Sequence, residues 1–88
     1  MKIKEGFVLR EIADTWVVVP VANRVVEFNG LMNLSESGAF LWKLMEEEAS
    51  EEELVAKLIS EYDDVDESTV RNDVQEFISE VKKRGLLE

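Results

Sequence analysis

The residue pattern changes after the first third of the chain, and this change restricts the possible folds more than any other feature. Two runs rich in β-branched and aromatic residues, at 7–12 and 16–19, flank a short polar connection. This arrangement predicts a β-hairpin. Residues 25–28 predict a third strand, which Asn29-Gly30 terminates. The first third is therefore expected to form a three-stranded antiparallel meander over about residues 6–29.

The rest of the chain repeats apolar residues at helical spacing and carries helix-start signals. Ser35 is a suitable N-cap for a first helix over about 36–47. Ser50-Glu51-Glu52-Glu53 forms a capping box before a second helix over about 51–62. Apolar residues wrap most of the first helix, so Trp42 is expected in the core rather than stacked on a ligand.

The third helix has the clearest pattern. Asp66 can cap it, and its apolar residues form one narrow stripe. The stripe consists of Val70, Val74, Phe77, Ile78 and Val81. Gly85 suits the left-handed residue that ends a helix, and Leu86 can then pack back onto Val81. Three strands followed by three helices predict an α+β, winged-helix-like fold in one domain over residues 1–88.

The composition argues against catalysis. The 88 residues include no cysteine and no histidine, which removes thiol nucleophiles, imidazole metal ligands and the usual general base at neutral pH. The glycines are too dispersed for a phosphate loop. We therefore expect no enzyme, no cofactor and no metal. The chain also lacks an apolar run of roughly 20 residues and a signal peptide, so a cytoplasmic protein without membrane contact is expected.

The net charge of −10 is concentrated in residues 46–67, which hold eleven acids and one base, Lys57. A surface for nucleic acid is disfavoured, because neutralising phosphates requires clustered lysine and arginine. The acidic segment lacks the glycine-centred spacing of an EF-hand loop. A solvated, helix-capping surface is the favoured interpretation, and an incidental cation site or partner contact is the alternative.

The third helix carries different charges on the two flanks of its apolar stripe, at 100° per residue. One flank holds Arg71, Gln75 and Lys82 beside Ile78, and the other holds Asp73 and Glu80 with Arg84. Two interpretations are open. These are ordinary surface charges, or the first flank is a groove wall whose basic lip faces something extended and acidic.

Three further segments share a pattern with known proteins. They are Val25-Val26-Glu27-Phe28-Asn29, Leu34-Ser35-Glu36-Ser37-Gly38-Ala39-Phe40-Leu41-Trp42, and Asp73-Val74-Gln75-Glu76-Phe77-Ile78 running on to Gly85-Leu86-Leu87. The chain resembles the PqqD family, also called RiPP recognition elements, from about residue 6 to its end. Ser35 and Ser37 stand at the Asn and Thr positions of the family's Leu-Asn-Glu-Thr-Gly-Ala pattern, and Ile78 replaces Leu in its Asp-Val-x-x-Phe-Leu pattern.

The resemblance implies a fold of three strands and three helices, and a role in binding peptides. Family members bind the leader of a ribosomally made precursor peptide and present its core to a modifying enzyme, often a radical SAM enzyme. The leader adds to the third strand and enters a cleft against the third helix, and an open edge strand is a template for such addition. The expected peptide-binding residues are Arg24, Val25, Val26, Glu27, Phe28, Arg71, Val74, Gln75, Ile78 and Lys82. A winged-helix nucleic-acid-binding or regulatory domain is the alternative.

Overall fold

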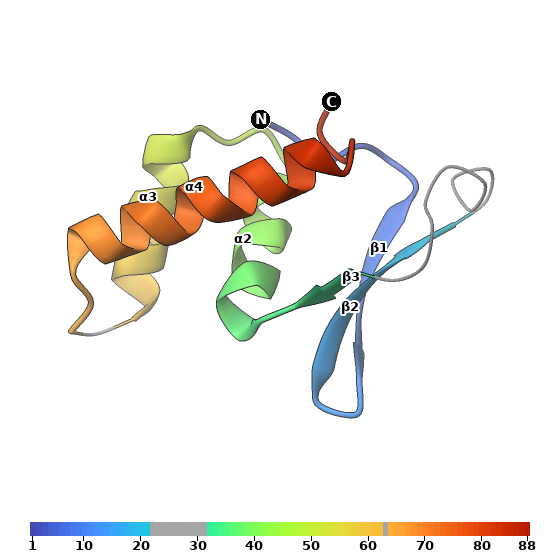
Figure 1. Cartoon of the computed structure of the whole chain (residues 1–88), viewed down its shortest axis with the longest axis horizontal. Helices are drawn as coiled ribbons and strands as arrows, with labels where there is room; N and C mark the ends of the chain where they lie inside the picture. The colour runs from blue at the N-terminus through green and yellow to red at the C-terminus, as the bar shows by residue number, and fades with distance from the viewer. Residues whose placement is uncertain (22–31, 63) are drawn as a thin grey trace.

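The computed structural model describes residues 1–21, 32–62 and 64–88 (Figure 1). Its strands are β1 (Phe7–Ile12), β2 (Thr15–Pro20) and β3 (Met32–Leu34), and its helices are α2 (Glu36–Met45), α3 (Glu51–Glu61) and α4 (Glu67–Lys83). The strands form one antiparallel sheet in the order β1-β2-β3, and the helices follow it. The predicted α+β fold is confirmed.

A two-residue turn joins β1 to β2. Ala13 and Asp14 have φ values of 49° and 66°, and Ile12 pairs with Thr15 across them. Two left-handed residues between paired strands are typical of a type I′ turn, whose twist matches that of the sheet. The predicted hairpin is confirmed.

The third strand of the described sheet is Met32–Leu34, which runs antiparallel to β2. The predicted third strand, residues 25–28, and its predicted end at Asn29-Gly30 lie outside the described residues. Sequence reasoning did not indicate a strand at 32–34, because three residues are too few to display the alternation that marks a strand.

The described helices begin at the predicted N-caps, Ser35, Ser50 and Asp66. Each cap side chain accepts a hydrogen bond from the backbone N–H three residues later, at 3.1 to 3.2 Å. The Glu53 carboxylate accepts a hydrogen bond from the backbone N–H of Ser50, which completes the capping box. These N-caps satisfy N–H groups that the helices cannot pair internally. Helices α2 and α3 end one or two residues before their expected ends.

Helix α4 ends in a Schellman motif, as Gly85 predicts. Gly85 has a φ of 74° and donates to the carbonyl of Lys82 at 3.0 Å, while Leu86 donates to that of Val81 at 2.9 Å. Leu86 is fully buried, and its carbonyl accepts from the N–H of Lys4 at 2.8 Å. The two ends of the chain lie together and form an antiparallel bridge (Figure 1).

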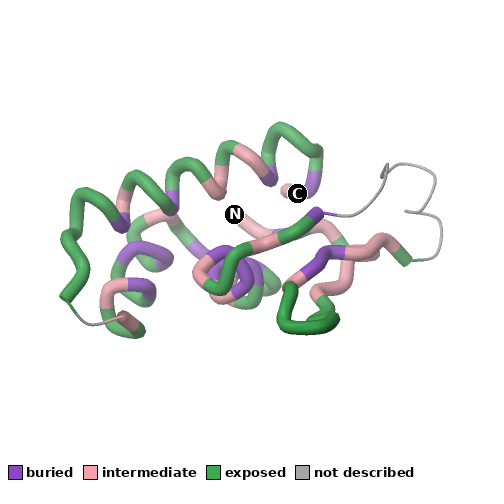
Figure 2. Tube along the Cα trace, turned by 60° about the horizontal axis from the view of Figure 1, so that its bottom comes forward, coloured by how far each residue is buried: buried purple, intermediate pink, exposed green. Residues whose placement is uncertain are grey.

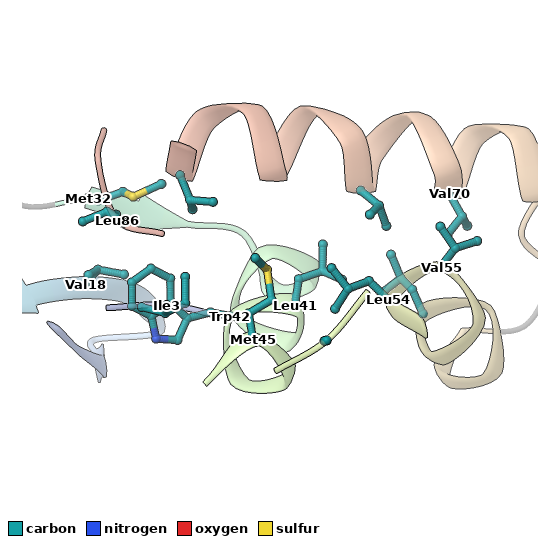
Figure 3. Packing of buried hydrophobic residues seen from close by; sticks show 14 residues of the cluster. Ile3, Val18, Met32, Leu41, Trp42, Met45, Leu54, Val55, Val70 and Leu86 are labelled. Atoms are coloured by element: carbon teal, nitrogen blue, oxygen red, sulfur yellow. The ribbon is translucent and has the colours of Figure 1, made fainter. Parts of the chain in front are cut away.

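The core fills the space between the sheet and the inner faces of the helices. It runs from Val18 and Met32 of the sheet, past Trp42 of α2, to Leu54 of α3 (Figure 3). Trp42 is fully buried, as predicted. The outer side of α4 is exposed along its length, and its buried residues face inward (Figure 2). This packing fixes the position of α4 relative to α2, α3 and the sheet. No helix in the described residues is long and apolar enough to span a membrane.

Candidate functional site

The hairpin turn determines which way the backbone of β2 points. Ile12 and Thr15 flank a two-residue turn and therefore form a hydrogen-bonded pair. Hydrogen-bonded and non-hydrogen-bonded pairs alternate along an antiparallel ladder. The backbone groups of Trp16 and Val18 consequently point toward β3 rather than β1.

The same alternation identifies the backbone groups at the outer edge of β3. Leu34 pairs with Trp16, and Met32 pairs with Val18, so these two residues use their backbone groups on β2. Asn33 lies between them, and its N–H and C=O point away from β2. Within the described residues no further strand pairs with β3. Its edge therefore presents one donor and one acceptor in the geometry that a parallel or antiparallel strand requires.

A groove of about 460 Å³ lies between the beginning of α2 and helix α4. Its lining residues are Ser35, Ser37, Gly38, Leu41, Asp73, Glu76, Phe77 and Glu80. A Cβ atom placed on Gly38 would lie 3.5 Å from the Cβ of Leu34 and 3.6 Å from the Cε1 of Phe77. Gly38 thus lies between the Leu34 side chain at the end of β3 and the Phe77 ring, and Ser35, the residue directly after β3, lines the groove together with residues of α4.

The groove has an apolar floor and an acidic wall. Leu41 is buried and Phe77 is half-buried, so the Phe77 ring keeps part of its surface open. The wall is one flank of α4, which carries Asp73, Glu76 and Glu80, and none of the residues that line the groove is basic. Such a surface favours an apolar side chain on the floor and positive charge along the wall.

Ion pairing neutralises this wall only at one end. The Nε of Arg84 lies 2.8 Å from Glu80 Oε1, at i,i+4 spacing. Glu76 accepts a hydrogen bond from the Asn72 amide at 3.3 Å, which supplies no charge. No described basic side chain lies within 4.0 Å of the Asp73 or Glu76 carboxylate.

Two residues of the predicted basic flank of α4, Arg71 and Gln75, contact α3. The Arg71 guanidinium makes two hydrogen bonds to the Glu52 carboxylate, at 2.6 and 3.1 Å, and Gln75 donates to Glu51 at 3.2 Å. The hydrogen bond from Arg71 and its charge lower the pKa of Glu52, and the same contact raises the pKa of Arg71. Arg71 and Gln75 therefore hold α4 against α3, and their contact with a peptide stays a prediction.

The other predicted site residues differ in how far they are buried. Val74 is fully buried in the core, Ile78 is half-buried and Lys82 is exposed. Arg24 and residues 25–28 lie outside the described residues. That these residues contact a peptide remains a prediction.

Sequence reasoning missed the groove wall as a site. It placed Asp73 and Glu80 on one flank of the stripe but had no information on which flank faces the sheet. The signal that could have indicated Gly38 and Phe77 is their position in the segments that carry the family resemblance. Their contact across the groove depends on tertiary packing, which no local pattern encodes.

A second cavity, of about 630 Å³, lies on the other side of α2, between the hairpin and the end of α3. The Lys43 Nζ sits 4.4 Å from the centre of the Trp16 ring, a cation–π contact, and Phe40 meets Tyr62 edge-to-face at 6.4 Å between ring centres. Burial, with the charges of nearby glutamates, raises the pKa of Tyr62. Among the described residues no cluster of three or more potential ligands could hold a metal ion.

Comparisons with known proteins give one consistent result. A sequence profile of the family described as coenzyme PQQ synthesis protein D (PqqD) matches residues 15–87. A solved structure described as "TbiB1 in Complex with the TbiA(beta) Leader Peptide" is similar, with a TM-score of 0.76 and 31% sequence identity. The similarity covers 100% of this chain and 95% of that one. No curated protein matches the sequence significantly.

Proposed function

Since the chain belongs to the PqqD family, as the profile match and the 31% identical structure show, we propose that it binds the leader segment of a ribosomally made precursor peptide. The leader adds as a strand to the outer edge of β3. Its side chains on one face then enter the groove against α4. The bound leader holds the rest of the precursor in place for a modifying enzyme, and a radical SAM enzyme is the partner that the family resemblance favours.

The observation that carries this proposal is that the groove lies next to the end of β3, because Ser35, which directly follows the strand, lines it. Strand addition derives affinity from backbone hydrogen bonds and specificity from pockets for alternate side chains. Asn33 supplies the outward backbone groups, and the Phe77 ring lies beside the strand's end. A related solved structure is described as a complex with a leader peptide, which supports a peptide as the ligand.

The proposed contact surface on α4 differs from the sequence-based one. Phe77, with the acidic flank beside it, faces the groove, whereas Arg71 and Gln75 are engaged by α3. Residues 24–28 precede β3 in the chain, and we retain them as predicted contacts of the added strand.

We also propose that the protein acts without a chemical step of its own. The sequence has neither cysteine nor histidine, so a catalytic role would have to use carboxylates or hydroxyls alone. The leader-binding role requires no bond to be formed or broken. A winged-helix role on nucleic acid is the weaker candidate, because the net charge is −10 and the groove is acidic.

Proline at position 33 tests the proposal. Asn33→Pro removes the outward N–H and leaves the bonds between β2 and β3 intact, and proline is tolerated at edge-strand positions whose N–H faces outward. Asn33→Ala is the matched control, because it removes the side chain and keeps the N–H. The probes are synthetic peptides that cover the short reading frames adjacent to the gene, measured by fluorescence anisotropy.

We expect one such peptide to bind the wild type, with Asn33→Pro weakening it at least about tenfold, or about 1.4 kcal/mol, and Asn33→Ala having little effect. Circular dichroism must show that both variants are folded. Equal affinities for a folded Asn33→Pro variant and the wild type would exclude strand addition at β3. Binding to duplex DNA at moderate salt, with no peptide bound, would favour the nucleic-acid alternative.

A further inference from the structure

The wall of the groove determines which leaders fit it, and it is acidic. We propose that the groove selects a leader segment in which lysine or arginine flanks an apolar residue. This inference rests on the proposed function, and it reverses the sign of charge that the sequence suggested for the ligand. It concerns the described surface formed by Asp73, Glu76, Phe77 and Glu80.

The apolar floor of the groove is the reason to expect an apolar residue in the leader. Phe77 is half-buried, and its ring borders Gly38 and the end of β3. A leader strand on β3 directs every second side chain toward one face of the sheet. One of these side chains reaches the open part of the Phe77 ring and the neighbouring Leu41, where removal from water stabilises it.

The acidic wall of the groove is the reason to expect basic residues in the leader. Asp73 and Glu76 have no basic partner among the described residues, whereas Glu80 is paired with Arg84. A leader that carried carboxylates here would meet like charges in a groove with no lysine or arginine among its described lining residues. A leader with positive charge gains attraction from two carboxylates that have no basic partner among the described residues, and it approaches faster because the chain has a net charge of −10.

The spacing of the wall sets the spacing in the leader. Asp73 precedes Phe77 by four residues, which is about 6 Å along a helix at 1.5 Å per residue. A strand covers this length in about two residues. Side chains on one face recur every second residue, so the basic residues are expected two positions before or after the apolar one.

The rest of α4 explains why this wall is available to a ligand. Its opposite flank is held on α3 by Arg71, whose guanidinium reaches Glu52 at 2.6 Å and Glu51 at 3.7 Å. The charge of Arg71 is therefore already paired with this chain's own acids. On the groove flank, Asp73 and Glu76 have no basic partner among the described residues, whereas Glu80 is paired with Arg84.

A selection experiment tests the inference. A random library of peptides about 14 residues long, displayed on their messenger RNA, is selected on the full-length protein. The selected peptides are synthesised and titrated by fluorescence anisotropy at low and high salt. Three variants are compared with the wild type: Asn33→Pro, a wall variant and a control variant. The wall variant combines Asp73→Asn, Glu76→Gln and Glu80→Gln. The control combines Glu46→Gln, Glu47→Gln and Asp64→Asn, which changes the net charge equally at residues outside the groove.

We expect peptides that Asn33→Pro weakens to be enriched in lysine or arginine two positions from an apolar residue. The wall variant should weaken them at least about tenfold at low salt, and high salt should reduce that loss. The control variant should change their affinity less than about threefold. A thermal melt shows whether each variant is folded.

Two different negative results separate the two proposals. Peptides that Asn33→Pro weakens, but that lack basic residues and bind the wall variant normally, would overturn the charge assignment and leave strand addition intact. Peptides that are insensitive to Asn33→Pro would overturn strand addition at β3, and the charge assignment with it. Equal losses in the wall and control variants would show an effect of net charge alone and would also overturn the assignment.

Discussion

Gly85 offers a direct test of how the end of α4 is held, because its substitution changes backbone energy and nothing else. Its φ is 74°, and a Cβ atom added there would have no heavy atom within 4 Å. Gly85→Ala therefore introduces no steric clash. Its cost is the left-handed conformation, about 1–2 kcal/mol for a residue with a Cβ. Alanine also restricts the unfolded chain, which offsets about 0.4–1 kcal/mol.

The expected net loss for Gly85→Ala is about 1 kcal/mol, which lowers the Tm of a domain of this size by about 4–8 °C. Fraying of the last turn cannot avoid this cost, because Leu86 is fully buried and its carbonyl is bonded to Lys4. Gly85→Asn is the matched variant, since asparagine tolerates the left-handed region better, and it should lose less. Urea and thermal unfolding measure both. A wild-type Tm for Gly85→Ala, or an equal loss in both variants, would refute this account of the helix end.

Two further predictions concern the core and a helix cap. Trp42→Ala should reduce the free energy of unfolding by about 3–5 kcal/mol in guanidinium titrations, because Trp42 is fully buried, and a loss below about 1 kcal/mol would contradict its central place. Hydrogen bonds from Ser68 and from the backbone of Thr69 lower the pKa of Asp66. Because the folded-state pKa is the lower one, the cap's contribution is present above the unfolded pKa, near 4, and is lost as the pH falls through the folded value. Asp66→Ala should therefore be less stable than the wild type at pH 7, with a gap that narrows below about pH 4, and a constant gap in urea unfolding would contradict this.

The sequence was sufficient for the parts of the fold that depend on local chemistry. The caps at Ser35, Ser50 and Asp66 accept the predicted bonds, and Gly85 adopts the predicted left-handed conformation. Each of these features needs only residues within one turn of the helix end. The hairpin was predictable for the same reason, because its turn and both strands are contiguous in the chain.

The groove was not predictable in the same way, because it depends on which flank of α4 faces which neighbour. The apolar stripe fixes which side of the helix is buried, but it leaves the two flanks equivalent. The ion pairs of Arg71 with Glu52 and Glu51 show that its flank lies toward α3, and they join residues 19 and 20 positions apart in the sequence. No local pattern reveals a partner at that separation.

One flank of α4 thus contacts α3 and the other lines the groove, and this difference affects specificity. The stripe residues between them are buried or half-buried, so truncating one of them costs stability as well as any effect on binding. The wall residues Asp73 and Glu76 are exposed, so changing their charge should alter recognition while the free energy of unfolding stays nearly constant. The proposed role predicts that a relative with lysine at these two positions keeps this fold and selects an acidic leader. In this protein, Asp73→Lys combined with Glu76→Lys should likewise change the selected peptides from basic to acidic.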